Sequence, residues 1–491
     1  MSQKTKVHTC LIFLSFSFNT KRLSGSFKVV NDDRQESIEV GIGVQDGNGY
    51  KDNTNNRGAN VYAILGKRFG NTIVKFLTVS GGQSNDLGWL GALESDIEQN
   101  RAYNQNSPDE DDDFFQSVNA VSSTTALSPT FTVNASAYYN YLNGNYDFDL
   151  NRFLYMESDG SMFNYALQHD MIGGLVSLNY SQGLLDVTNG YHISNFQRDH
   201  TGSLDDVELY TNSGTKKEYN TSLNVEYGGD FKLFGNAQVR RATFDYVGDT
   251  DFEQLEWDFL NYQVGVRYNG LYYSYGTTGR EPARTDLFGG EDNFVELVDV
   301  EPERANNHEL GYRTDNLSVN VYHMSFENEI VLNGQYGPNS LPIRSNVASS
   351  TRMGVETQLE GSVEQIQYRI AYTYSNNTVE QENVEFNHVL SPENILSVNL
   401  TRNILGVDVS TLFRYQSSMN LDLANEFEVD GYTNLDIVLS REITDDLTLT
   451  ANVNNVLNND YFTYGSVNVL GEPTYFTNAS ANFLATLEWR F

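Results

Sequence analysis

Apolar residues recur at every second position along most of this chain, a pattern typical of β-strands and not of helices. The segment Ser37–Val44 alternates four branched aliphatic residues with small or polar ones. The same alternation appears in four further segments, at 131–141, 261–276, 316–326 and 447–456. In the last of them the polar positions hold Thr and Asn, neutral side chains that suit a water-filled interior. The pattern therefore predicts an all-β chain whose strands are apolar on one face.

The last ten residues continue this alternation to the end of the chain. One face carries Phe483, Leu487, Trp489 and Phe491, while the other is polar apart from Leu484. Chain ends are usually frayed and polar, so an aromatic end needs an explanation. Two interpretations of this segment alone are open: the last strand of a soluble sandwich, or the closing strand of a transmembrane barrel whose apolar face meets lipid.

The lengths of the connections separate these two interpretations. Tight connections are expected at 32–37, 68–71, 403–406 and 443–446, and long polar ones at 81–115, 191–219 and 333–351. Outer-membrane barrels have short periplasmic turns and long extracellular loops, whereas a sandwich has no reason for such a bias. We therefore expect a large antiparallel transmembrane β-barrel of about 20–22 strands.

Length and composition agree with a barrel. A chain of 491 residues is too long for one ordinary soluble core, but a large barrel can use it as one domain. The sequence has no run of 18 apolar residues, which argues against transmembrane helices. The 31 Tyr and 28 Phe suit strands and the aromatic girdles of a barrel, and only 8 Pro interrupt them.

The net charge and the motifs of the sequence limit the classes of function that are possible. The formal net charge of −34 argues against nucleic acid or anionic lipid surfaces as partners. Cys10 is the single cysteine, so no internal disulfide forms, and the seven histidines lack metal-ligand spacing. The sequence contains no nucleophile elbow, phosphate-binding loop or dinucleotide fingerprint. We therefore expect neither an enzyme nor a bound cofactor.

The acidic run 109–113 lies in one of the expected long loops. A solvated, self-repelling loop is the favoured interpretation. Clustered carboxylates also suit hard cations, although the EF-hand spacing is absent. The weak metal candidates are Asp109, Asp111, Asp112 and Asp113.

Residues 1–20 have two interpretations. Two lysines precede a short apolar run from Cys10 to Phe18, which resembles a secretion signal without a clear cleavage site. The alternative is a first barrel strand that begins close to Met1. In either case residues 21–491 are expected to form the barrel.

Several motifs, in order, resemble the barrel of TonB-dependent outer-membrane receptors. Segment 274–331 has the family's Arg-Glu-Pro turn, then "PE", then an "ELGY" strand. Segments 351–361 and 434–465 resemble its Gly-Val-Glu strand and its penultimate hairpin, and segments 17–27 and 46–53 its first hairpins. The residues that match the family motifs are Arg280, Pro282, Pro302, Glu303, Glu309, Gly311, Gly354, Glu356 and Asn455.

The resemblance implies a multi-pass barrel in the bacterial outer membrane that takes up a scarce nutrient with the TonB complex. A ferric siderophore is the expected ligand, with cobalamin, haem and glycans left open. It also implies that Phe491 is read by the barrel-assembly machinery and that Trp489 anchors in the interface with lipid. Aromatic and polar loop residues would contact the ligand, and the candidates are Trp89, Tyr103, Tyr336 and Arg344.

One departure from the family concerns the plug domain that precedes the barrel in such receptors. Barrel-like sequence here begins near residue 21, which leaves no room for a plug or for a TonB-contacting box. The expectation is a truncated gene or a fragment, with a plugless pore or a plug from another chain as alternatives. Three functions therefore remain: a TonB-dependent receptor barrel, a passive pore, and a secreted soluble β-rich binding protein.

Overall fold

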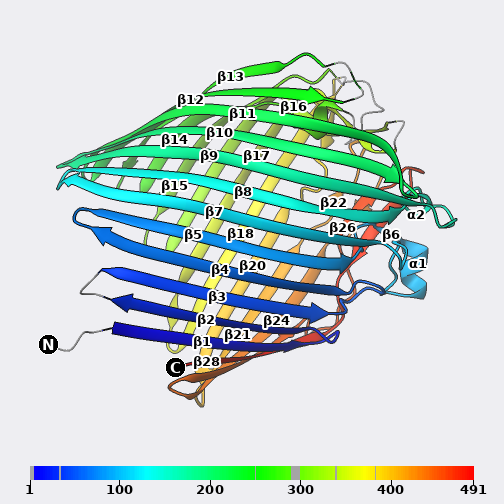
Figure 1. Cartoon of the computed structure of the whole chain (residues 1–491), viewed down its shortest axis with the longest axis horizontal. Helices are drawn as coiled ribbons and strands as arrows, with labels where there is room; N and C mark the ends of the chain where they lie inside the picture. The colour runs from blue at the N-terminus through cyan, green and yellow to red at the C-terminus, as the bar shows by residue number, and fades with distance from the viewer. Residues whose placement is uncertain are drawn as a thin grey trace.

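One antiparallel sheet curls round and closes on itself (Figure 1). The computed structural model describes residues 5–31, 35–248, 250, 252–288, 299–337, 340–381 and 383–491. Within these residues 22 strands form a closed barrel, as the alternation predicts.

The first eleven strands of the wall are β1 (Thr5–Phe16), β2 (Lys21–Asn31), β3 (Glu36–Gly47), β4 (Asn56–Phe69), β5 (Thr72–Asp86), β7 (Asp111–Ser128), β8 (Phe131–Asp149), β9 (Met162–Gln182), β10 (Leu185–Leu204), β11 (Val207–Gly228) and β12 (Phe231–Val247). The next eleven are β13 (Leu255–Tyr268), β14 (Leu271–Arg280), β15 (Glu303–Arg313), β16 (Leu317–Tyr336), β17 (Pro342–Val363), β18 (Ile366–Gln381), β20 (Asn394–Ile404), β21 (Val407–Gln416), β24 (Tyr432–Thr444), β25 (Leu447–Asn454) and β28 (Asn482–Arg490). A short strand, β19 (Val384–Asn387), adds to the loop end of β18.

The barrel closes where β1 pairs with β28. The two strands run antiparallel, with Cys10 opposite Arg490 and Phe16 opposite Leu484. Beyond that ladder the backbones of Thr9 and Phe491 exchange two hydrogen bonds of 3.0 Å. An unpaired backbone group in hydrocarbon costs several kcal/mol, so closure removes the sheet edges that lipid cannot solvate.

Connections alternate strictly between a short-turn end and a long-loop end. At the short-turn end each link between neighbouring wall strands has two to four residues, such as 70–71, 129–130, 229–230 and 405–406. The four tight connections expected from the sequence all lie at this end. The short-turn end is thus the one predicted to face the periplasm, and the long-loop end is the one predicted to face the cell exterior.

For two of the three expected long loops, the prediction from sequence is wrong in detail. Segment 191–219 belongs to the paired strands β10 and β11, with a two-residue turn at Asp205 and Asp206. Segment 333–351 likewise belongs mostly to β16 and β17, and beyond them the N–H of Gly337 donates to the carbonyl of Leu341 at 2.8 Å. Strands that extend beyond the membrane are wet on both faces, so they lose the alternation while keeping their hydrogen-bond ladder. Of the three segments expected to be long loops, 81–115 does contain one, at 87–110.

The loops at the long-loop end contain the remaining elements. These are β6 (Ala92–Leu93), α1 (Glu94–Gln99), α2 (Leu150–Phe153), α3 (Arg284–Leu287), β22 (Met419–Asn420), β23 (Glu428–Val429), β26 (Phe462–Val467) and β27 (Pro473–Thr477). Strand β6 pairs with β27, which joins loops 87–110 and 455–481 across the chain (Figure 1). Arg101 secures this junction by donating to the carbonyl of Tyr461 at 2.8 Å and pairing with Asp460 at 2.8 Å.

Side chains alternate between the outer face and the lumen as the register requires. On β11 the outer face carries Tyr219, Leu223 and Tyr227, which are 51%, 45% and 55% exposed. Exposed tyrosines on either side of Leu223 are what the aromatic girdles of an outer-membrane barrel lead us to expect. Among the residues that the structure describes, no helix has the length and apolar character needed to cross a membrane.

Leu223 and Asn224 give a test of which face meets lipid. Leu223→Arg places a cation in the middle of the outer band and should lower the free energy of unfolding by about 2–4 kcal/mol. The matched control Asn224→Arg puts the same side chain into the lumen and should cost well under half as much. Guanidinium unfolding of the barrel in phospholipid vesicles measures both. Equal losses for the two variants would contradict the assignment of faces.

Candidate functional site

The turn that follows β14 is anchored in the barrel by the carboxylate of Glu281. This side chain is only 4% exposed. Its two oxygens lie 2.6 Å from Arg240 Nη1 and 2.6 Å from Lys216 Nζ. Lys216 and Arg240 lie on the lumen faces of β11 and β12, and both also pair with Glu218. Charges of alternating sign therefore fasten the turn to the inner wall.

The pKa of Glu281 reflects these contacts. Burial alone would raise this pKa, but hydrogen bonds from Arg240 and Lys216 outweigh burial and lower it to about 2. The folded state therefore favours the ionised carboxylate. Its contribution to stability is complete above pH 4.5 and is lost as the pH falls towards 2.

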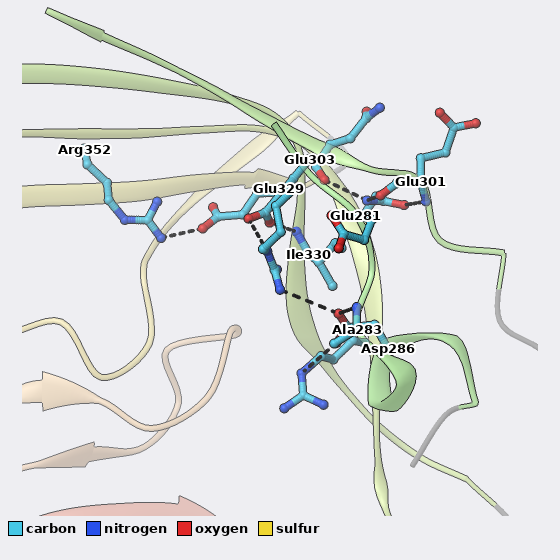
Figure 2. Close-up of polar contacts among 12 residues, drawn as sticks. Glu281, Ala283, Asp286, Glu301, Glu303, Glu329, Ile330 and Arg352 are labelled. Carbon is cyan, nitrogen blue, oxygen red and sulfur yellow. Dashed lines mark hydrogen bonds and ion pairs between the residues drawn. The ribbon is translucent and has the colours of Figure 1, made fainter. Parts of the chain in front are cut away.

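A second group of contacts holds the start of α3 (Figure 2). Arg280 lies opposite Glu303 in the β14–β15 ladder, and its Nε is 2.8 Å from Glu303 Oε1. Asp286 is buried and accepts a 2.7 Å hydrogen bond from the backbone N–H of Ala283. Arg344, from β17, reaches the same Asp286 carboxylate at 3.5 Å. Arg280 Nη1 also lies 3.9 Å from Asp286 Oδ2, so two of the predicted residues, Arg280 and Arg344, meet around one aspartate.

A third group extends this network to β16 and β17 (Figure 2). Glu329 accepts from Arg352 Nη2 at 2.5 Å and from the hydroxyl of Ser350. Glu303 Oε2 accepts from the backbone N–H of Ile330 at 3.1 Å, which joins the second and third groups. The network therefore spans the loop end of the wall from β11 to β17, and its carboxylates are committed to structural contacts.

The other motif residues do not converge on this network. Pro302 precedes Glu303, and Glu309, Gly311, Gly354 and Glu356 lie further along β15 and β17. A Cβ at Gly311 would lie 2.3 Å from the ring of Tyr272, and one at Gly354 would lie 2.6 Å from the hydroxyl of Tyr322.

These two glycines make room for tyrosines that fill the lumen side of the wall. Asn455 holds a turn after β25, where its φ of 49° and its side-chain bonds to the carbonyls of Asn459 and Ala479 fix the chain.

The candidate ligand residues are dispersed around the mouth. Trp89 packs on Phe148 and Phe153, with ring centroids 6.2 and 5.8 Å apart. Tyr103 donates to Gln105 at 3.3 Å within the same loop. Tyr336 donates to the carbonyl of Val467 and so ties β16 to loop 455–481. Ligand contact by any of these residues stays a prediction.

The acidic run divides between a loop and a strand. Asp109 lies in loop 87–110, whereas Asp111, Asp112 and Asp113 begin β7. Asp112 accepts from Asn85 at 2.7 Å. Among the described residues, no group of three or more His, Cys, Asp or Glu side chains is arranged to hold a metal ion.

Glu110, between the loop and the strand, is buried beneath the loop. Burial raises its pKa, although Asn106 and the N–H of Ser107 donate to it.

The sequence prediction missed a pocket of about 230 Å³ between the inner wall and the Glu281 turn. We call it the wall pocket, and its lining includes His169, Phe196, Arg198, Gly214, Lys216, Phe244, Trp257, Glu281, Pro282 and Arg284. Four of these residues lie in segment 191–219, which the sequence prediction assigned to a loop. The sequence nevertheless contained a signal for this shared face, because residues two apart on a strand point to the same side. The four residues all have even numbers and pair across β10 and β11: Phe196 with Lys216, and Arg198 with Gly214.

Substitution of Glu281 tests the anchoring network. Glu281→Gln should lower the free energy of unfolding at pH 7 by about 3 kcal/mol, since it leaves Lys216 and Arg240 with Glu218 as their remaining acidic partner. The difference from the wild type should shrink as the pH falls from 4.5 towards 2. Glu256→Gln is the matched control, because Glu256 pairs with Arg241 at the exposed outer face and should cost below about 1 kcal/mol. A pH-independent difference would contradict the assignment.

Comparisons with known proteins agree with this architecture. The family profile "TonB dependent receptor-like, beta-barrel" matches residues 19–456. A comparison with curated protein sequences gives no match. Among solved structures, the ferric-catecholate import receptor Fiu from E. coli K12 is similar over 99% of this chain and 82% of its own, at 15% identity and a TM-score of 0.79.

Two further solved structures share the fold at low sequence identity. The siderophore receptor PiuA from Acinetobacter baumannii matches 100% of this chain and 82% of its own, at 13% identity and a TM-score of 0.80. The copper transporter OprC matches 100% and 81%, at 13% identity and a TM-score of 0.83.

The profile match covers most of the chain and extends from β2 to β25. This protein therefore belongs to the family of TonB-dependent receptor β-barrels, which are transport receptors of the Gram-negative outer membrane.

Proposed function

We propose that this chain is the barrel of a receptor for the TonB-dependent uptake of a scarce nutrient, and that the nutrient is a ferric siderophore. The observation that carries the proposal is the long-loop end. There, loops joined by β6 and β27 stand above an inner wall rich in aromatic and cationic side chains. A chelate bound between the loops and the wall would replace its contacts with water by contacts with aromatic rings and fixed charges.

The neighbours described as Fiu and PiuA are receptors for ferric-catecholates and siderophores, which supports the same class of cargo here. The copper transporter OprC shares the fold as well, so the fold alone does not select the metal. The proposed partners are therefore a metal chelate outside, the TonB complex inside, and outer-membrane lipid around the wall.

Uptake of ⁵⁵Fe tests the proposal. Iron-limited cells that lack the gene should lose uptake of at least one ferric siderophore, and the full-length gene should restore it. An uncoupler that collapses the proton-motive force should abolish the restored uptake, because TonB-dependent transport is energised. Uptake that persists with the uncoupler and rises linearly with concentration would instead indicate a passive pore. Unchanged uptake of every chelate in the deletion strain would refute an iron receptor.

We further propose that Phe491 serves recognition by the barrel-assembly machinery as well as packing in lipid. Phe491 and Phe483 are 61% and 58% exposed on the same outer face of the closing strand. Substitution of either by Ser removes a similar apolar area, so lipid packing alone predicts equal effects.

We expect Phe491→Ser to reduce the heat-modifiable, folded band in outer membranes at least about threefold, and Phe483→Ser to leave it near the wild-type level. The comparison uses unboiled gels of cells that express each variant equally. A similar loss in both variants would reduce the role of Phe491 to lipid contact.

A further inference from the structure

Two arginines near the short-turn end place charge on the outer wall of the barrel. Arg402 lies on β20 and Arg441 on β24, and β21 lies between these two strands (Figure 1). Both side chains are exposed. A cation on the lipid face is costly in the middle of the bilayer and is tolerated close to the head groups. The surroundings of the two arginines therefore decide what they can bind.

The ladder registers place Arg441 on the outer face, just inside the level of Trp489. Arg441 is opposite Leu449, and Leu449 is opposite Leu487 on the apolar face of the closing strand. Partners across an antiparallel ladder point to the same side of the sheet, so Arg441 faces lipid. Trp489 is opposite Leu447, two residues nearer the short turn than Leu449. Arg441 therefore lies one outward position deeper than the tryptophan that is expected to anchor at the interface.

Arg402 occupies the same face at a similar depth. It is two residues from the end of β20, and Arg441 is three residues from the end of β24. Arg402 is opposite Val409, which is opposite Leu439, the outward residue that precedes Arg441 on β24. The two arginines thus flank an apolar strip, on strands that lie about 10 Å apart at twice the usual spacing. Two side chains of this length can reach one group between them.

The patch around the two arginines is positive. Among the residues that the structure describes, neither Arg402 nor Arg441 has an acidic partner. The other outward positions of β20, β21, β24, β25 and β28 hold uncharged residues. Lys67 is a contrast, because this cation near the end of β4 pairs with Glu36 of β3 at 2.8 Å. The net charge of −34 disfavours anionic surfaces for the chain as a whole, but its carboxylates lie away from this part of the outer wall.

The patch also interrupts the aromatic residues that mark the short-turn end. Strands β11, β13 and β15 end there with exposed tyrosines, Tyr227, Tyr268 and Tyr312. Strand β20 ends instead on Ile404, which is 48% exposed, and the next residue, Leu405, is 95% exposed in the turn. The wall thus offers cations and aliphatic side chains at a level where neighbouring strands offer aromatic rings.

We propose that Arg402 and Arg441 bind the phosphate of an anionic phospholipid in the periplasmic leaflet, with its acyl chains along Val409 and Leu439. Guanidinium groups are planar forks whose paired donors match phosphate oxygens. Their methylene stems stay in the apolar band while the charged ends reach the head groups. A zwitterionic lipid also carries an ammonium group, which the positive patch would repel. The site therefore prefers a head group of net negative charge, such as phosphatidylglycerol.

Brominated lipids test this site with the full chain refolded in vesicles. Three substitutions remove the 3 native tryptophans: Trp89→Phe, Trp257→Phe and Trp489→Phe. Val409→Trp then places a fluorescent reporter between the two arginines. The control reporter is Val321→Trp, because Val321 of β16 lies on the same outer face between apolar partners, Leu310 and Val355.

We expect brominated phosphatidylglycerol to quench the reporter at position 409 more strongly than the one at 321, and brominated phosphatidylethanolamine to quench both equally. Arg402→Gln and Arg441→Gln should each weaken this preference at least about threefold, since one basic residue is lost from an anionic leaflet. The double variant should abolish it. Arg313→Gln is the matched control, because Arg313 lies near the same end of β15 but shares the lumen face of Gly311.

Two outcomes would overturn the inference directly: equal quenching by phosphatidylglycerol at positions 409 and 321, or a preference that survives the double variant. Inorganic phosphate, added at constant ionic strength, separates a lipid from a soluble anion. A preference that phosphate abolishes would assign the arginines to a free anion and overturn the lipid site.

Salt gives a readout that needs no arginine variant. The preference should fall as the NaCl concentration rises, because salt screens exposed charges, and a preference that does not depend on salt would contradict the inference. Unboiled gels show whether each variant is folded. All of these outcomes are independent of the cargo, so the proposed uptake is tested separately by ⁵⁵Fe.

Discussion

Pairing of every backbone amide and carbonyl in lipid is the constraint on which the rest of this structure depends. Strands can satisfy it only by closing into a ring, and here the ladder from Cys10–Arg490 to Phe16–Leu484 completes that ring. Closure then fixes which side chains meet lipid, because the register transmits one alternation round all 22 strands. It also places every long loop at one end, opposite the row of links that have two to four residues.

The long-loop end faces a different problem, since strands such as β9 to β12 extend past the lipid and must remain ordered in water. Buried ion pairs and small aromatic clusters provide that order. Glu281 gathers Lys216 and Arg240, and Phe288 packs with Tyr246 at 4.6 Å. Buried ion pairs bring little net stability, because desolvation offsets their attraction. Their value here is positional: they hold the turn over the inner wall and so define the wall pocket.

The family motif and the ligand candidates have different physical roles. Arg280 and Glu303 fasten two neighbouring strands, and Gly311 and Gly354 leave room for Tyr272 and Tyr322. These residues shape a scaffold that receptors for different cargo can share. Under the proposed function, we expect selectivity to depend instead on side chains of the loops at the mouth. The low identity to neighbours with the same fold is consistent with that division.

The sequence by itself determined the all-β class, the barrel, the tight turns and the family. Each of these follows from local patterns: a period of two, turn residues, and ordered short motifs. Segment 191–219 shows where local reasoning stops, because a strand that is wet on both faces looks like a polar loop. The tertiary structure alone decided that this segment pairs as β10 and β11. It alone also brought Arg198, Trp257 and Arg284 to one pocket. Those three residues are dozens of positions apart, and only the curvature and register of the closed sheet set the distances between them.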